Sequence, residues 1–178
     1  MKRLHLTAQV VIASLVSGAV WGQSITLPER NGPRPQTTDG VPHVQIDAKP
    51  IPALSRELLR QVGNFKGMIL EETRIGFPGS VGFNLGPELP VVRPDSIVIA
   101  REIAHMHPDG SLHAALDPQT AKRAIAKGWA IEHPWSKRRD GWEGFVMIYT
   151  PTTDDELQIV ITLIEDSYRF ITGVSPVN

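Results

Sequence analysis

The chain contains no cysteine. A disulfide framework, a thiolate metal site and a cysteine nucleophile are therefore excluded. The formal net charge is only −1 at pH 7, so no basic excess indicates nucleic acid or an anionic membrane surface as a partner. The sequence also lacks a phosphate-binding glycine-rich loop, a nucleophile elbow and a dinucleotide-binding fingerprint. The chemistry of this protein has to come from other residues.

The N-terminus has the layout of a signal peptide, which we place at residues 1–22. Lys2 and Arg3 form a short positive region, and a mostly apolar stretch follows it to Val20. Small residues then stand at the positions that precede a cut before Gln23. The alternative is a transmembrane anchor, but the stretch is short for one and no positive cluster follows. We therefore expect a secreted or periplasmic protein without stable membrane insertion after cleavage.

The rest of the chain divides into a tether and one domain. Six prolines occur in residues 23–52, with no hydrophobic periodicity, which is typical of a flexible, extended tether. His43 lies in this segment. Residues 53–178 then have the length of one domain, since a domain takes about 100–200 residues.

Three helices are expected in this domain. The first begins near Ser55, which can cap it, and ends at Gly63. The second has Asp117 as its N-cap, a proline at the first helical position, and Gly128 after its end. The third opens with a Thr-Asp-Asp-Glu capping box at residues 153–156.

Strand patterns occur in neighbouring pairs. Residues 67–75 and 80–85 flank a Gly-Phe-Pro-Gly turn, residues 97–103 are β-branched and apolar, and residues 145–149 have the pattern of a buried strand. Paired strands and few helices predict an α+β fold, a mainly antiparallel sheet packed by two or three helices.

Three histidines lie within nine residues, at His105, His107 and His113. Side chains alternate along a strand, so His105 and His107 share one face. Where His113 points depends on the length of the turn. A three-residue loop, residues 108–110, pairs His105 with His113 and brings all three imidazoles to one face. The sequence Pro-Asp-Gly favours this loop, with glycine at a left-handed position.

Three imidazoles on one face allow three interpretations. They can bind a transition metal. They can act as general bases and hydrogen-bond donors around an organic substrate, because histidine titrates near neutral pH. They can also be structural. No carboxylate completes an obvious facial triad, although Glu102 and Asp109 are near in sequence.

Three further residues are candidates for the same pocket. His133 is a fourth histidine, Trp129 can form a wall for a planar ligand or pack in the core, and Tyr149 can offer its phenol to a pocket or tie down a turn. Surface or rim positions are expected for Glu132, Trp135, Trp142 and Glu143.

The chain resembles the luciferase domain of bioluminescent fungi. The resemblance covers residues 97–173 and is carried by Arg101-Glu102-Ile103-Ala104-His105-Met106-His107, Leu112-His113, Lys127-Gly128-Trp129, His133-Pro134, Tyr149-x-Pro151 and Asp155-Glu156. The chain departs from the fungal enzymes in two ways: its connection between the second and third histidines is shorter, and its N-terminus looks like that of a secreted protein, whereas theirs anchors them to a membrane.

The resemblance implies a small-molecule substrate and molecular oxygen as co-substrate. The fungal enzyme oxidises 3-hydroxyhispidin, a hydroxylated styrylpyrone, without a known organic cofactor, through deprotonation of an enol and addition of oxygen to the carbanion. Catalytic candidates are then His105, His107, His113, His133 and Tyr149. Substrate-binding candidates are Arg101, Glu102 and Trp129. Light emission does not follow from the resemblance.

Three functional hypotheses follow. The first is a cofactor-independent oxygenase acting on an aromatic or enol-type small molecule, with no metal. The second is a metal-dependent enzyme that binds a transition metal ion through His105, His107 and His113. The third is a non-catalytic periplasmic module that binds a small molecule.

Overall fold

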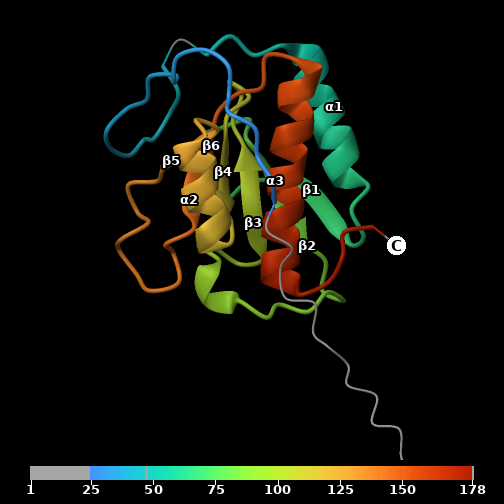
Figure 1. The fold of residues 1–178 in the computed structure, drawn as a ribbon. Coiled ribbons are helices and arrows are strands. Elements are labelled where there is room, and N and C mark those ends of the chain that lie inside the picture. The colour runs from blue at the N-terminus through green and yellow to red at the C-terminus, as the bar shows by residue number, and fades with distance from the viewer. Residues whose placement is uncertain (1–24, 47, 178) are drawn as a thin grey trace, which may run out of the picture.

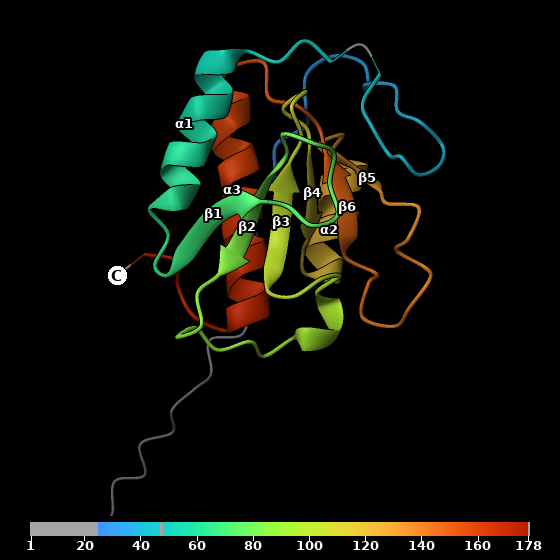
Figure 2. The same cartoon turned by 180° about the vertical axis from the view of Figure 1, so that it is seen from behind.

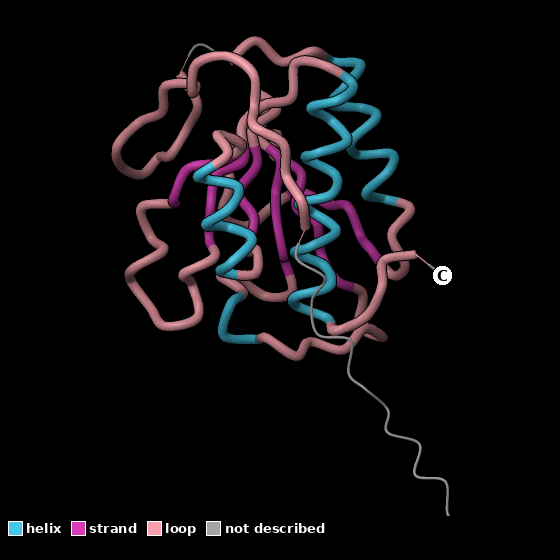
Figure 3. The backbone as a smooth tube through the Cα atoms, in the orientation of Figure 1, coloured by secondary structure: helices cyan, strands magenta, loops and turns pink. Residues whose placement is uncertain are grey.

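The computed structural model describes residues 25–46 and 48–177, so the expected signal peptide lies outside the described residues. Six antiparallel strands form one sheet in the order β1-β2-β3-β4-β6-β5, and three helices pack on it (Figures 1 and 3). The predicted α+β class is confirmed. The strands are β1 Met68–Glu72, β2 Val81–Leu85, β3 Glu102–Met106, β4 Leu112–Ala115, β5 Ala130–Glu132 and β6 Phe145–Ile148. The helices are α1 Pro52–Gly63, α2 Pro118–Ala126 and α3 Asp154–Thr172, with a short 3₁₀ turn at Pro94–Ser96.

All three helices cover the same face of the sheet (Figures 1 and 2). Alternation along the central strands sends one set of apolar side chains into the core beneath α3. This set comprises Ala104, Met106, Leu112, Ala114, Val146 and Ile148. Helix α3 contributes a buried stripe, and burying each large apolar side chain stabilises the fold by roughly 1.5–3 kcal/mol. The residues between them in sequence, His105 and His113 among them, point to the opposite face.

The helix signals explain where the helices begin. Asp117 accepts hydrogen bonds from the backbone N–H groups of the next turn, and Thr153 accepts one from Glu156, so both predicted N-caps are confirmed. The predicted cap at Ser55 is wrong. Helix α1 begins at Pro52, whose fixed φ and missing N–H suit the first helical position.

The strands differ from the prediction in two places. The strand expected over residues 97–103 begins only at Glu102 and continues to Met106. Its apolar beginning is a loop, because Ile97 packs in the core and Ala100 adopts a left-handed φ of 48°. Strand β5 was not anticipated, since three residues carry too little pattern to be recognised.

One connection crosses the face opposite the helices, and another extends from the edge of the sheet at β5 and β6 (Figure 2). Residues 73–80, between β1 and β2, cross in front of β3 and β4 (Figure 2). Residues 133–144 form the long loop between β5 and β6. The open face of the sheet is therefore partly roofed where the histidines emerge.

Residues 25–46, which we call the N-terminal segment, pack on the domain rather than extending from it. They run between α2 and α3 and then pass over the end of the sheet (Figure 1). Leu27 joins the core cluster and His43 is buried. This differs from the expected flexible tether, because prolines without periodicity do not reveal side chains that dock on a distant surface. Among the described residues, no helix is long and apolar enough to cross a membrane.

Candidate active site

The β3–β4 hairpin brings the three clustered histidines to one face, and this prediction is confirmed. His105 pairs with His113, and the backbone N–H of His107 donates to the carbonyl of Ser111 at 2.8 Å. Gly110 has the left-handed φ, 82°, that the three-residue turn requires. The three-residue turn therefore places all three imidazoles on the same face of the hairpin.

Five imidazoles meet above the open face of the sheet. His133 lies directly after β5, and His43 is supplied by the N-terminal segment. No ring of the five is more than 6% exposed. The His113 ring is central: its centroid lies 4.4 Å from that of His133, 4.6 Å from His107 and 5.1 Å from His105. Burying five ionisable rings away from water costs folding free energy, and such clusters are typical of functional sites.

Glu102 reaches this cluster through a β-bulge. The register between β2 and β3 shifts between Phe83 and Asn84, so that Ile103 is an extra residue without a partner. A bulge interrupts the alternation of side chains and re-aims the residue beyond it. Glu102 consequently faces the same side as His105, with 2.8 Å between its Oε1 atom and His105 Nδ1.

Gly82 provides the space for the Glu102 carboxylate. Gly82 pairs with His105 across the strands, and a Cβ atom there would lie 2.6 Å from Glu102 Oε2. The Thr73 hydroxyl donates to Glu102 Oε1 at 2.9 Å. The carboxylate is thus fixed as an acceptor beneath the histidines.

The hydrogen bonds of Glu102 determine which ring nitrogens carry protons. The carboxylate accepts from His105 Nδ1, and in the neutral form of His105 this leaves Nε2 as an acceptor. His113 Nδ1 lies 3.2 Å from this Nε2 atom and is its donor. His113 Nε2 is therefore left with a lone pair. It is buried and, among the described residues, has no hydrogen-bond partner.

A second chain of hydrogen bonds fixes His107. The Ser111 hydroxyl donates to Asp109 Oδ1 at 2.7 Å, so Ser111 Oγ accepts from His107 Nδ1, 3.1 Å away. His107 then also presents Nε2 as a lone pair.

His133 carries its proton on the other ring nitrogen. The backbone N–H of Trp135 donates to His133 Nδ1 at 3.0 Å, so the proton of the neutral ring is on Nε2. The cluster therefore offers lone pairs from His107 and His113 and an N–H donor from His133.

Burial keeps these rings neutral. Desolvation, with a further contribution from His105, lowers the pKa of His107 to about 4. Desolvation and the neighbouring His43 lower the pKa of His133 to about 3. Burial likewise lowers the pKa of His113 and of His43. Neutral imidazoles at pH 7 can accept a proton or bind a metal.

The rings line a small cavity of about 110 Å³. Its other walls are mostly apolar: Val41, Pro42, Ile75, Phe77, Trp135 and Phe145. Phe77 approaches His107 edge-on, with centroids 5.3 Å apart. Apolar walls and several ring nitrogens are the lining chemistry that suits a mostly apolar group carrying an oxygen atom.

Two groups of three nitrogens are close enough to hold a metal ion. In each group, His105–His107–His113 and His43–His113–His133, one nitrogen per ring lies within 4.8 Å of the others. The hydrogen bonds oppose each group at one ring. In the first group, His105 Nε2 already accepts a hydrogen bond from His113, so a metal would require that bond to break. In the second group, His133 Nε2 carries a proton and so offers no lone pair to a metal.

Four predicted site residues lie outside the cavity wall, and Glu102 and Arg101 are two of them. Glu102 is not a wall residue but acts through His105. The Arg101 guanidinium donates to the carbonyls of Leu85, Gly86 and Leu89 at 2.6–2.9 Å, which ties down the loop after β2.

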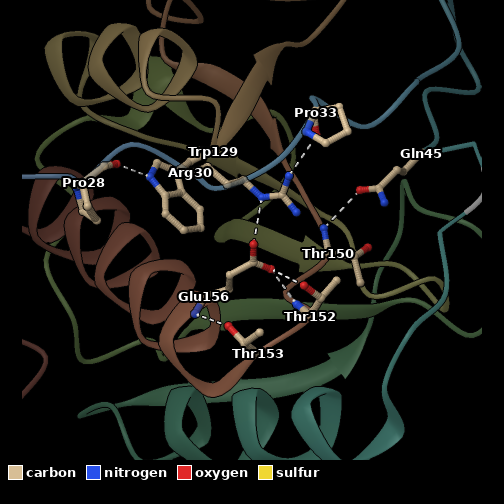
Figure 4. A network of polar contacts seen from close by, with 9 residues as sticks. All are labelled: Pro28, Arg30, Pro33, Gln45, Trp129, Thr150, Thr152, Thr153 and Glu156. Carbon is tan, nitrogen blue, oxygen red and sulfur yellow. Dashed lines mark hydrogen bonds and ion pairs between the residues drawn. The ribbon is translucent and has the colours of Figure 1, made fainter.

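Trp129 and Tyr149 hold the N-terminal segment instead of lining the cavity. Trp129 Nε1 donates to the carbonyl of Pro28 at 2.7 Å (Figure 4). The Arg30 guanidinium lies 5.9 Å from the centroid of the Tyr149 ring.

Sequence reasoning missed His43, Phe77, Trp135 and Phe145 as wall residues. Trp135, expected at the rim or surface, is half-buried and lines the cavity beside His133, with 5.4 Å between ring centroids. His43 carried no signal beyond its residue type, because it is far from the others in sequence and surrounded by prolines.

The site geometry can be set beside known proteins. Residues 100–167 match the luciferase domain family. This matched range contains the β3–β4 hairpin, Glu102 and four of the five histidines. His43 lies outside it.

The chain is also similar to fungal proteins named luciferase. Those of Armillaria gallica and Armillaria ostoyae are each 32% identical over 167 residues, and that of Neonothopanus nambi is 29% identical over 170 residues. The alignments cover 83% of this chain, so the similarity extends upstream of residue 97. The chain spans only about three fifths of the length of these relatives, 61–62%. No solved structure matches the chain.

Proposed function

We propose that this luciferase-domain protein is a cofactor-independent oxygenase that acts on an enol-type or aromatic small molecule. The observation that carries the proposal is the buried lone pair of His113 Nε2, on a ring that lines the cavity and is backed by the Glu102–His105 chain. The similarity to fungal luciferases supports a small-molecule substrate and molecular oxygen as partners.

The first step is a proton transfer. His113 Nε2 takes the proton of the enol, and the resulting imidazolium is stabilised through His105 by the Glu102 carboxylate. The proton on His133 Nε2 donates a hydrogen bond to the enolate oxygen. Burial makes both interactions stronger than they are in water.

The second step joins carbon and oxygen. The enolate carbon supplies the electrons for a new C–O bond to dioxygen, which is reduced to a peroxide anion. The proton held by His113 then moves to the distal peroxide oxygen. Substrate and dioxygen together give one hydroperoxide, so that no other oxidant or reductant is consumed.

Oxygen uptake tests this proposal. Residues 23–178, purified without an affinity tag, are supplied with a panel of hydroxylated pyrones and related enols in an oxygen electrode. We expect uptake with at least one compound and its loss in His107→Ala and His113→Gln. No uptake across the panel contradicts the proposal, and tight retention of a compound without turnover identifies a binding module instead.

A metal-dependent enzyme is the second candidate, and the spacing of His105, His107 and His113 favours it. Elemental analysis of the untagged protein distinguishes the two candidates. A stoichiometric metal, together with loss of activity on chelation, replaces the first proposal by the second. Substoichiometric metal with activity that survives chelators retains the first.

A further inference from the structure

The N-terminal segment enters the cavity at His43. The chain of residues 36–46 forms a closed turn, in which Thr38 N donates to the carbonyl of Val44 at 3.0 Å and Ile46 N donates to that of Gln36 at 2.8 Å. The Thr38 hydroxyl also donates to the carbonyl of Pro42 at 2.7 Å. This local network holds His43 in one orientation.

Three anchors attach the segment to the elements that carry the site (Figure 4). Pro28 is bound by Trp129, directly before β5. Arg30 pairs with Glu156 in the first turn of α3, Nε to Oε1 3.2 Å, and both side chains are about nine-tenths buried.

The third anchor lies beside the cavity turn. Gln45 Oε1 accepts from the backbone N–H of Thr150, directly after β6, at 3.1 Å. The turn that carries His43 is therefore fixed relative to the strands beneath the other histidines.

The His43 ring lies against the reactive end of the cluster. It stacks on His113 with centroids 5.4 Å apart and an angle of 11° between planes, and it meets His133 edge-on at 5.1 Å. His43 is 3% exposed. Its Nδ1 atom is buried and, within the described part of the chain, has no hydrogen-bond partner.

Among the described residues, His43 Nδ1 and His113 Nε2 are both buried without a hydrogen-bond partner, on rings that stack on each other, and are thus available to a group of a bound ligand. One nitrogen from each of His43, His113 and His133 lies within 4.8 Å of the others. A single oxygen atom can stand at hydrogen-bond distance, about 2.8 Å, from nitrogens separated by that much. One hydroxyl of a ligand can therefore satisfy this corner of the cavity.

We propose that His43 is a further catalytic residue, delivered by the N-terminal segment, whose Nδ1–H donates to the substrate oxygen that His113 deprotonates. The proton moves from the substrate hydroxyl to His113 Nε2, and the oxygen that becomes negative accepts from His43 and His133. His43 stays neutral throughout. This assignment rests on the proposed function, and it lies outside the range of the family match.

The test compares substitutions at His43 with a neighbour in the same turn. His43→Phe keeps a ring of similar size but removes both nitrogens, and His43→Gln restores an N–H donor. Asp39→Asn, at an exposed position of the turn, is the control. We expect kcat for oxygen uptake to fall about 100-fold in His43→Phe. His43→Gln should recover part of this loss, and Asp39→Asn should stay within twofold of wild type.

Binding provides a readout that does not need turnover. The probe is the most tightly bound hydroxypyrone of the panel, measured by calorimetry under nitrogen. We expect its Kd to rise about tenfold in His43→Phe but not in Asp39→Asn, with the circular dichroism and Tm of all variants matching wild type. If wild type binds the probe but consumes no oxygen, the oxygenase proposal fails while this contact is still measured. Equal affinity in wild type and His43→Phe, or no binding to either, overturns the assignment.

The anchors are tested by hydrogen exchange. Arg30→Met removes the buried ion pair, and Arg169→Met removes an exposed ion pair to Glu165 on the same helix α3. Amides of residues 36–46 should exchange at least tenfold faster in Arg30→Met, and its kcat should fall with them. Unchanged exchange and unchanged kcat in Arg30→Met overturn the role of the segment.

Discussion

The Glu102 carboxylate should act on the reaction without touching the substrate, and Glu102→Gln isolates that role. Glutamine keeps an oxygen that can accept from His105 Nδ1, so the substitution removes the charge but not the hydrogen bond. Before proton transfer the His113 ring is neutral, so the substitution changes little. Once His113 holds the substrate proton, the wild type stabilises this cation and the variant does not.

The magnitude follows from the hydrogen-bonded chain. The links of 2.8 and 3.2 Å and the width of one imidazole ring place a charge on His113 about 8 Å from the carboxylate. At an effective dielectric constant of about 20, the attraction is about 2 kcal/mol. Since 1.36 kcal/mol is a factor of ten in rate, kcat should fall about 30-fold.

Steady-state oxygen uptake measures this effect. KM should stay within twofold, because Glu102 is not a wall residue of the cavity. Glu71→Gln is the matched control: Glu71 is exposed on the neighbouring strand β1 and pairs with Gly82. A Glu102→Gln enzyme with kcat within threefold of wild type would refute the idea that charge reaches His113 through His105.

Four further predictions test the surroundings of the site. Gly82→Ala places a methyl group 2.6 Å from Glu102 Oε2, so kcat should fall as in Glu102→Gln, and the free energy of unfolding by about 1–2 kcal/mol in urea titrations. Arg101→Met removes the side chain that binds three loop carbonyls; it should lower the free energy of unfolding by about 2–3 kcal/mol, while kcat/KM of the folded protein stays within threefold. The pKa values of His107 and His133 are lowered to about 4 and about 3, so these rings stabilise the fold above the unfolded pKa of 6.5. This contribution is lost as the pH falls from 6.5 towards 4. The urea midpoint should drop over that window, and each ring should contribute up to about 1.4 kcal/mol per pH unit to the loss. Burial raises the pKa of Asp166 to about 6, so its contribution runs the other way and is lost as pH rises from 3.8 to 6, and Asp166→Asn should make the acid loss of stability steeper.

The hairpin that gathers the histidines could be predicted because its signals are local. Side-chain alternation and the Pro-Asp-Gly turn are both encoded within nine residues, and together they fix the pairing of His105 with His113. The N-caps Asp117 and Thr153 are equally local, since a cap acts within one turn of its own helix. Local rules of this kind also determine the fold class.

The remaining parts of the site depend on contacts between distant residues. The bulge at Ile103 arises where β3 pairs with β2, and nothing in the sequence of β3 alone marks it. The family resemblance implied Glu102 as a substrate contact, whereas the bulge turns it towards His105. The docking of the N-terminal segment is likewise a tertiary event, because its anchors join Pro28 to Trp129 and Arg30 to Glu156.

Which nitrogen of each ring carries the proton decides the chemistry. The hydrogen-bond partners around the histidines determine it, not the histidines themselves. A carboxylate below His105 and a serine hydroxyl beside His107 accept, so these rings donate away from the cavity and turn lone pairs towards it or towards His113. A backbone N–H against His133 has the reverse effect. Five equivalent residues in the sequence thus become acceptors and donors in the fold. A cluster of uniform lone pairs would suit a metal ion, whereas a lone pair beside an N–H suits a hydroxyl group that is to lose its proton, and this difference is the reason for preferring enol chemistry at this site.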